Sequence, residues 1–306
     1  MQKIISRSIQ VGTVILGWAL TPVIGEYLID RTGQLTPLQL SFFRYFFASM
    51  VLFILLLFNT KNVFKKIFDS FINKWKIYLL SSGICAGMPV LLFFSVKWTS
   101  ASSASFLLNS NIILIPIFAF FFIREKISKW QTIGIMISFL GLFLVIFDKD
   151  LLTLFQLSKL NMLGNLLAFS SGIFWALYTI ILKKYFSDEN PLLVTFLNLF
   201  IGSIFLAGFA FSIDLDYLQV NLSGWFLILL IAIVSTSLAY TFWLTLLKGL
   251  SSTKTGIIQA FVPIVSVILA IIFLDESISY IFSIGAVLIA GGIFFVERNF
   301  KEKGVS

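Results

Sequence analysis

One arginine lies inside a long apolar run of this sequence instead of in a connection between runs. Arg44 is that residue, and Glu26 is the acid nearest to it within an apolar run. A charge within a membrane-crossing segment costs at least about 2.5 kcal/mol on insertion scales, so it normally faces a cavity or a partner. The pattern indicates that Arg44 binds an anionic group of a ligand, or that Arg44 and Glu26 form a gating or coupling pair. The structural alternative is an arginine that snorkels to headgroups or joins two helices.

Polar residues also recur at helical spacing within two apolar runs. Ser105 and Asn109 share one face of the first of these runs, and Gln259 lies in the second. Pro116 and Pro263 lie in the same runs, where each removes a backbone hydrogen bond and can kink or unwind a helix. Open backbone beside an amide side chain could coordinate a polar substrate. These residues are therefore predicted to line a cavity, with hydrogen bonding between helices as the alternative.

Four aromatic residues with polar atoms lie near the middle of apolar runs. They are Trp18, Trp175, Tyr178 and Tyr240. Trp and Tyr in membrane proteins usually lie at the lipid–water interface, and buried indole and phenol groups need hydrogen-bond partners. The position predicts an aromatic cavity wall that could stack on aromatic or cationic solutes. Packing in the protein core is the alternative.

The composition excludes several kinds of chemistry. The chain has no histidine and a single cysteine, Cys85, so histidine-based catalysis and a cysteine-based metal cluster are ruled out. No glycine-rich phosphate-binding motif is present, and direct use of ATP is not expected. We therefore expect neither an enzyme nor a metal or cofactor. The net charge of +8 is better explained by membrane topology than by nucleic-acid binding.

The elements that must position these residues are membrane-crossing helices. Mean hydropathy is +1.01, and 59% of the residues are hydrophobic while 12% are charged. About 20 apolar residues cross the hydrocarbon core as a helix, and the chain has ten runs near that length. The fold class is therefore an all-α integral membrane protein with ten transmembrane helices. The predicted spans are residues 9–29, 38–58, 77–97, 101–123, 129–147, 161–183, 191–213, 224–247, 252–274 and 279–297.

Basic residues are distributed unevenly between the connections of these spans. Of the 22 lysines and arginines, 17 fall in the segments that share a side with both termini, four fall on the other side, and Arg44 is within a span. Basic connections stay in the cytoplasm, so both termini are predicted to be cytoplasmic.

The first and second halves of the chain resemble each other. Trp18 corresponds to Trp175, Pro37 to Pro191, and the glycines that follow each fourth span repeat in the same order. Each half, residues 1–150 and 151–306, holds five spans. Because five is odd, the second half must be inverted, and the substrate site is expected near the middle of the membrane between the halves. Asn198 stands where a second copy of Arg44 would be, which excludes a symmetric two-arginine site.

Several stretches resemble the EamA-type domains of the drug/metabolite transporter (DMT) superfamily. The stretch "FFSVKWTSASSASFLLNSNIILIPIFAFFFIREKISKWQTIGIMISFLGLFLVI" is similar to the second part of such a domain, and "FFRYFFA" to its arginine-containing second helix. "NMLGNLLAFSSGIFWALYTIILKK" and "AFVPIVSVILAIIFLDESIS" resemble parts of a second domain. The resemblance covers about residues 9–297. It implies ten helices and membrane transport of small metabolites, amino acids or related solutes, commonly by export.

These observations predict a secondary active transporter in the cytoplasmic (inner) membrane. It would move small polar or amphipathic metabolites by alternating access, with export expected over uptake. The alternative is a flippase or carrier for lipid-linked headgroups. The expected partners are a small-molecule substrate and membrane lipids, and the glycine-rich helix surfaces leave a homodimer possible.

Overall fold

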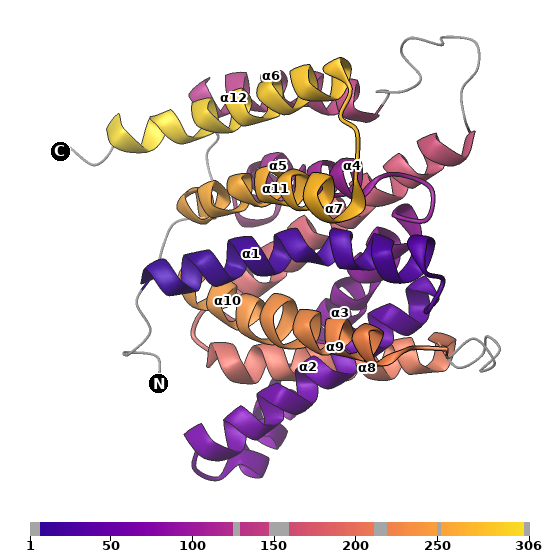
Figure 1. Ribbon diagram of the computed structural model, residues 1–306. Coiled ribbons are helices and arrows are strands. Elements are labelled where there is room, and N and C mark those ends of the chain that lie inside the picture. The colour runs from indigo at the N-terminus through magenta and orange to yellow at the C-terminus, as the bar shows by residue number, and fades with distance from the viewer. Residues whose placement is uncertain (1–6, 125–128, 147–158, 211–218, 250–251, 303–306) are drawn as a thin grey trace.

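The structure is a computed structural model that describes residues 7–124, 129–146, 159–210, 219–249 and 252–302, and within those ranges it contains helices and no strand. The predicted boundary between the halves, at residues 150 and 151, falls outside them. Most helices run across the view of Figure 1, and α1 begins on the same side of the molecule on which α12 ends. The elements in chain order are α1 (Arg7–Glu26), η1 (Tyr27–Arg31), α2 (Pro37–Asn59), α3 (Val63–Ser95), α4 (Ala101–Leu108), α5 (Asn111–Ile123), α6 (Lys129–Ile146), α7 (Lys159–Tyr185), α8 (Pro191–Ala210), α9 (Leu222–Leu230), η3 (Ile231–Leu238), α10 (Ala239–Gly249), α11 (Ser252–Leu274) and α12 (Tyr280–Glu302).

The helical class and the membrane-spanning character expected from the sequence are confirmed. Within the described residues, seven segments are long and apolar enough to cross a membrane: Arg7–Arg31, Pro37–Asn59, Val63–Ser95, Ala101–Ile123, Leu160–Tyr185, Pro191–Ala210 and Leu222–Lys248. Three shorter apolar helices fall inside the other three predicted spans: Thr132–Val145, Phe261–Leu274 and Tyr280–Gly292. By length alone, then, seven of the ten predicted spans qualify.

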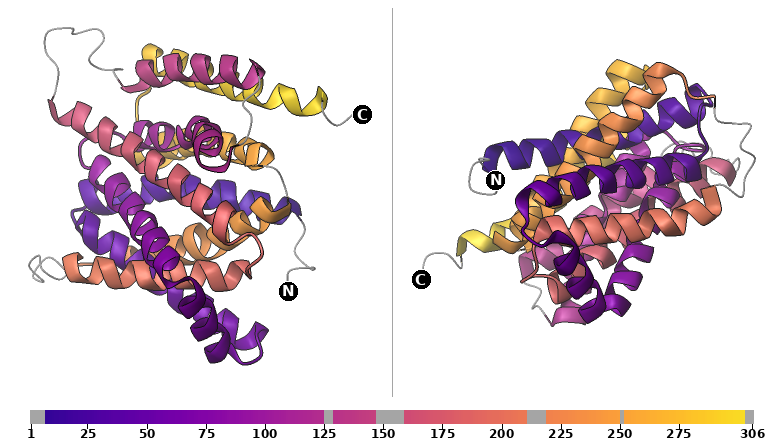
Figure 2. Two further views of the ribbon diagram at one scale, coloured as in Figure 1. Left: turned by 180° about the vertical axis from the view of Figure 1, so that it is seen from behind. Right: turned by 90° about the horizontal axis from the view of Figure 1, so that it is seen from below.

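Helices of the two halves pack against each other in matching pairs. α2 packs on α8, and α6 packs on α12, so each contacts the helix at its own place in the other half. α3 packs on α7 as η3 and α10 pack on α1, and α4 and α5 pack on α7 as α11 packs on α1. Figure 1 shows α6 and α12 side by side at the top of the bundle, above α5 and α11, and the reverse view in Figure 2 shows the same layer. The arrangement is compatible with an inverted repeat.

Glycines bring α6 and α12 into backbone contact. A Cβ atom on Gly141 would lie 2.6 Å from the carbonyl oxygen of Gly285, and one on Gly285 would lie 2.8 Å from that of Gly141. Such close approach is the usual role of small residues between membrane helices. The glycine surfaces at these two positions are therefore used within one chain.

Candidate functional site

A narrow cavity of about 30 Å³ lies between helices of both halves, beside the middle of α1. That volume holds roughly two water molecules, whereas cavities for small-molecule ligands are about 300–1,000 Å³. Six of the eight residues predicted to bind substrate line it: Trp18, Arg44, Asn109, Trp175, Tyr240 and Gln259. The sequence did not single out the other lining residues, which are Thr21, Met88, Leu92, Leu108, Asn111 and Val262.

Arg44 is a buried cation with a free donor at the cavity wall. The residue is 1% exposed, and its Nε donates a hydrogen bond of 2.6 Å to Thr236 Oγ1. Its guanidinium carbon lies 5.9 Å from the ring centroids of both Phe93 and Tyr240, which is cation–π distance. Nη1 is buried and has no hydrogen-bond partner. Neither of the two ion pairs among the described residues involves Arg44, so its charge lacks an acidic partner there.

Thr236 reaches Arg44 because η3 is a π-helix, a form often found at functional sites. The Thr236 hydroxyl donates to the carbonyl of Ile231, five residues earlier, at 2.9 Å. Its oxygen is thereby left to accept from Arg44. α1 approaches η3 closely at Gly17, where a Cβ would lie 3.0 Å from the Ser235 Cα. A run of three hydroxyl residues within an apolar segment was the sequence signal for this contact.

Asn198 holds the corresponding position in α8, and both polar atoms of its side chain are hydrogen-bonded within the protein. Its Oδ1 accepts hydrogen bonds from Ser81 Oγ at 2.5 Å and Ser82 Oγ at 3.3 Å. Its Nδ2 donates to the carbonyl of Val194 at 2.9 Å. The two halves therefore differ in polar chemistry at matching places.

Aromatic rings from both halves form another wall of the cavity. The Trp18 and Trp175 ring centroids are 5.0 Å apart, and that of Tyr240 lies 5.2 Å from Trp175 and 6.2 Å from Trp18. The indole nitrogens of both tryptophans are buried and have no hydrogen-bond partner. The sequence did not indicate Trp243, whose ring centroid lies 5.2 Å from that of Trp18. Trp243 does not line the cavity.

Tyr178 and Ser105 were predicted to line the cavity but lie outside its lining. Tyr178 is 2% exposed, and its ring lies 5.7 Å from that of Trp175. Ser105 is 1% exposed, and its backbone carbonyl accepts a hydrogen bond of 2.7 Å from the Asn109 side chain. Both residues are packed behind residues that do line the cavity.

The fourth span is interrupted beside the cavity. α4 ends at Leu108 and α5 begins at Asn111. The side-chain Nδ2 of Asn111 donates a hydrogen bond of 2.7 Å to the carbonyl oxygen of Leu108. The break precedes Pro116, which lies inside α5, while α11 continues without interruption through Pro263. α7 packs directly on the break, because a Cβ on Gly172 would lie 2.6 Å from the Leu108 carbonyl oxygen.

Two amide oxygens complete the polar lining. Asn111 Oδ1 and Gln259 Oε1 are buried without a hydrogen-bond partner. Buried polar atoms in proteins are nearly always paired. Together with Arg44 Nη1 and the two indole nitrogens, they are unsatisfied donors and acceptors on residues that line the cavity.

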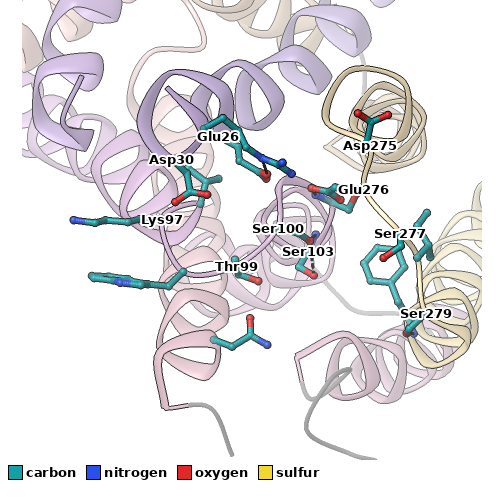
Figure 3. A pocket seen from close by; sticks show the side chains of 17 residues that line it. Glu26, Asp30, Lys97, Thr99, Ser100, Ser103, Asp275, Glu276, Ser277 and Ser279 are labelled. Carbon is teal, nitrogen blue, oxygen red and sulfur yellow. Dashed lines mark hydrogen bonds and ion pairs between the residues drawn. The ribbon is translucent and has the colours of Figure 1, made fainter. Parts of the chain in front are cut away.

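A larger polar pocket of about 400 Å³ opens beyond the C-terminal end of α1. Figure 3 shows its side chains, which come mainly from the end of α1 and η1, the α3–α4 connection and the connection from α11 to α12, with others from the first turns of α4, α7 and α12. Its lining includes the acids Glu26, Asp30, Asp275 and Glu276 and the basic residues Arg31 and Lys97. In the predicted orientation this is the outer side.

Glu26 pairs with Arg31 in this region and not with Arg44. Arg31 Nε lies 3.2 Å from Glu26 Oε1, and Arg31 Nη2 donates to the Leu274 carbonyl at the end of α11 at 3.0 Å. Glu26 Oε2 accepts a hydrogen bond of 2.6 Å from the Ala101 amide, which begins α4. A carboxylate at a helix N-terminus is stabilised by the unpaired N–H groups there. The predicted Glu26–Arg44 pair is therefore wrong as a direct contact.

The network around Glu26 lies between the cavity and the outer pocket. Glu26 follows Thr21, which lines the cavity, by five residues, or about 7.5 Å along a helix. Glu276, from the other half, also reaches the start of α4, where it accepts a 3.4 Å hydrogen bond from the Ser102 amide. The beginning of α4 is thus held by acids from both halves.

A second polar cluster connects α3, the segment after α7 and α10 at the helix ends opposite to the Glu26–Arg31 pair. Lys74 Nζ of α3 lies 2.9 Å from Glu189 Oε1 and donates to the Tyr185 carbonyl at 2.8 Å. Lys248, near the end of α10, donates to the Glu189 carbonyl. In the predicted orientation this cluster is on the cytoplasmic side.

Comparison with known proteins identifies a family and a shared fold. The model of the EamA-like transporter family matches residues 9–147 and 162–298. The chain is 27% identical over 281 residues to the uncharacterized transporter YyaM of Bacillus subtilis, covering 89% of this chain and 90% of that protein. It is 28% identical over 297 residues to the uncharacterized transporter YetK of the same species, covering 92% and 83%.

Similar proteins extend to archaea and to a crystal structure. An uncharacterized transporter of Archaeoglobus fulgidus is 25% identical over 292 residues, covering 92% of this chain and 96% of the relative. One crystal structure superimposes with a TM-score of 0.67 at 17% identity, covering 94% of this chain and 98% of that one. At that identity the likeness concerns the fold alone.

Proposed function

This chain belongs to the EamA-like transporter family, and from that premise we propose that it is a secondary active transporter working by alternating access. The substrates are small polar or amphipathic metabolites, such as amino acids or related solutes. The membrane is the cytoplasmic one, both termini face the cytoplasm, and export is the expected direction. Membrane transport follows from the family.

The observation that carries the proposal is the unpaired guanidinium of Arg44. A buried charge without a partner is costly, and a substrate carboxylate or phosphate would supply the missing acid and a second hydrogen bond. Arginine suits such groups because its planar donors bind them in pairs. Thr236 holds Nε, so the side chain is already oriented with Nη1 free. An anionic group on the substrate is therefore part of the proposal.

The remaining lining favours a substrate that is not purely ionic. The faces of Trp18, Trp175 and Tyr240 suit an apolar, aromatic or cationic portion. Asn111 Oδ1 and Gln259 Oε1 could accept hydrogen bonds from an ammonium or amide group. We propose that these residues, with Asn109, orient the substrate, and that Ser105 and Tyr178 support them from behind.

Alternating access requires closures on both sides of the binding site. The Glu26–Arg31 pair and the Lys74–Glu189 pair lie toward opposite helix ends. Glu26 and Arg31 are joined to other helices through the Ala101 amide of α4 and the Leu274 carbonyl of α11, and Lys74 of α3 contacts the segment after α7. The cavity of about 30 Å³ is too small for a metabolite, which supports a closed form that must open to load. The matching helix pairs supply two bodies that could rock against each other. Glu26 and Arg31 are the proposed outer gate.

A flux assay with purified protein in proteoliposomes tests the proposal. The panel contains amino acids, amines, nucleosides and organic acids, each with and without an imposed proton gradient. We expect saturable flux of at least one solute with an anionic group. The test variant is Arg44→Gln, which should keep the thermal unfolding temperature of the unmodified protein but lose most of that flux.

Two results would count against the proposal. One is the absence of saturable flux for every solute from protein that unfolds cooperatively. The other is transbilayer movement of a fluorescent lipid that is sensitive to Arg44→Gln, which would favour the flippase alternative.

A further inference from the structure

The third long helix, α3, has more residues than are needed to cross a membrane. It runs from Val63 to Ser95 over 33 residues, whereas about 20 suffice. Lys74 has non-helical backbone angles, φ −135° and ψ 27°, and separates segment 63–73 from the rest. This segment has a length of about 16 Å. Together with the end of α2 it protrudes at the bottom of the bundle in Figure 1, in the half of the view in which α1 begins, and the left view of Figure 2 shows the same projection from behind.

One face of segment 63–73 packs on the protein. Val63 and Ser70 are buried, and the Ser70 hydroxyl lies 2.8 Å from that of Tyr78, across the kink. Lys74 at the kink is fixed by its ion pair with Glu189. The segment is therefore held in place by the protein and has two free faces.

One free face is apolar. Phe64, Phe68 and Ile72 follow each other at intervals of four residues and are 71%, 64% and 50% exposed. Side chains four apart lie above one another on a helix. Trp75, beyond the kink, is 47% exposed. Three large apolar side chains on a segment of this length are unfavourable in water.

The other free face is charged. Lys65, Lys66 and Asp69 are exposed, and Lys61 and Lys76 are exposed on either side of the segment. Charged side chains at this density cannot lie in the hydrocarbon. A helix with exposed aromatic residues on one face and exposed lysines on the next fits the boundary between acyl chains and headgroups.

We propose that segment 63–73 is an interfacial helix that binds the anionic phospholipid headgroups of the cytoplasmic leaflet. The segment and its flanks carry four exposed lysines and one exposed acid. Their net charge is therefore positive. Anionic headgroups attract such clusters, and the apolar face enters the layer beneath them. The cytoplasmic placement rests on the proposed orientation, but the binding of anionic lipid does not depend on transport.

Site-specific fluorescence tests the inference without a transport measurement. A bimane label is attached to Phe68→Cys or Asp69→Cys in a Cys85→Ala background, and the full chain is placed in vesicles of phosphatidylcholine with brominated lipid. At position 68 we expect quenching by brominated acyl chains and little quenching by aqueous iodide. At position 69 we expect the reverse.

Lipid preference is measured with the label at position 68. Brominated phosphatidylglycerol should quench at a lower fraction of total lipid than brominated phosphatidylcholine. Lys65→Gln and Lys66→Gln should each reduce the preference about five-fold, and Asp69→Asn should increase it. Lys129→Gln, which removes an exposed lysine at the start of α6, is the matched control and should change nothing.

Three outcomes would overturn the inference. Equal quenching by both lipids in every variant would remove the charge preference. Strong iodide quenching at position 68 would place the apolar face in water. Excimer emission from a pyrene label at the same position, with loss of lipid quenching, would show that a second copy of the chain covers it.

Discussion

The indole rings of Trp18 and Trp175 meet edge to face, with centroids 5.0 Å apart and planes at 79°. These two residues occupy matching positions in the two sequence halves. In a two-fold arrangement a residue can contact its own counterpart only near the axis. On the proposal of an inverted repeat, the contact places the two-fold axis at the wall of the cavity, where Trp175 is also in contact with Tyr240. A change at either tryptophan should affect the same site.

Removal of the Arg44 charge should impair transport strongly. A hydrogen bond to a charged group contributes about 1.5–3 kcal/mol, so Arg44→Gln should lower the transport efficiency kcat/KM for an anionic substrate about 10- to 100-fold. The kcat/KM of Arg44→Lys should lie between those of the unmodified protein and Arg44→Gln, because lysine keeps the charge but not the planar donors. Initial flux rates in proteoliposomes measure both. Arg124→Gln, at an exposed helix end, should transport normally, and equal loss in that variant would contradict a specific role for Arg44.

The free indole nitrogens should contribute to substrate affinity. Trp18→Phe and Trp175→Phe keep an aromatic ring but remove the donor, and each should raise KM about 2- to 10-fold. Trp243→Phe also removes a buried unpaired nitrogen, but Trp243 does not line the cavity. Its KM should stay unchanged. Concentration series of substrate flux decide this, and a similar change in all three variants would indicate a general packing effect.

Weakening of the Glu26–Arg31 contact should expose the cavity from the outer side. In a Cys85→Ala background, Thr21→Cys reports access through its rate of reaction with a membrane-impermeant maleimide. Because Arg31 is partly exposed, Glu26→Gln or Arg31→Gln should raise that rate only about 2- to 5-fold.

The double variant separates a gate from two independent effects. Its rate should not exceed that of Arg31→Gln alone, because that change already removes both the ion pair with Glu26 and the hydrogen bond to Leu274. Asp30→Asn, which alters the same pocket, is the control. Rates that multiply in the double variant would argue against the pair as a gate.

Gly172 should be intolerant of a larger residue. Gly172→Ala would place a Cβ 2.6 Å from the Leu108 carbonyl oxygen, and overpacking of this kind costs about 1–3 kcal/mol. The apparent unfolding temperature in detergent should fall. Gly208→Ala is matched to it, since no atom lies within 4 Å of that Cβ, and it should be neutral or slightly stabilising. Equal unfolding temperatures would mean that α7 moves away from the break at little cost.

Hydropathy and helical spacing predicted the helices and half of the residues that line the cavity. Long apolar runs have few alternatives in lipid, and a polar residue within such a run usually faces other helices. Arg44 and Gln259 were found in this way. Asn111 was equally visible as an amide in an apolar run, and the sequence reasoning stopped at Asn109.

The π-helical turns could not be read from the sequence. Glu26 and Arg31 are five residues apart, and in an α-helix residues at that spacing point to different faces. η1 brings them together, whereas the sequence pairing favoured Arg44 because both lie within apolar runs. Thr236 was not predicted for the same reason, because its contact with Arg44 depends on the π-helical geometry of η3. Helix α3 posed another difficulty, since segment 63–73 mixes lysines with aromatic residues and has no continuous apolar run.

The contrast between Arg44 and Asn198 bears on the balance between the two open forms. With chemically identical halves, exchange of their roles would turn the inward-open form into the outward-open form, and both would have the same free energy. The two residues differ, because Arg44 in α2 carries a charge and an unpartnered Nη1, whereas Asn198 in α8 is neutral and hydrogen-bonded at both polar atoms, and this difference removes that degeneracy. On the alternating-access proposal, the inward-open and outward-open forms of the substrate-free protein therefore have unequal populations, even when no gradient is imposed.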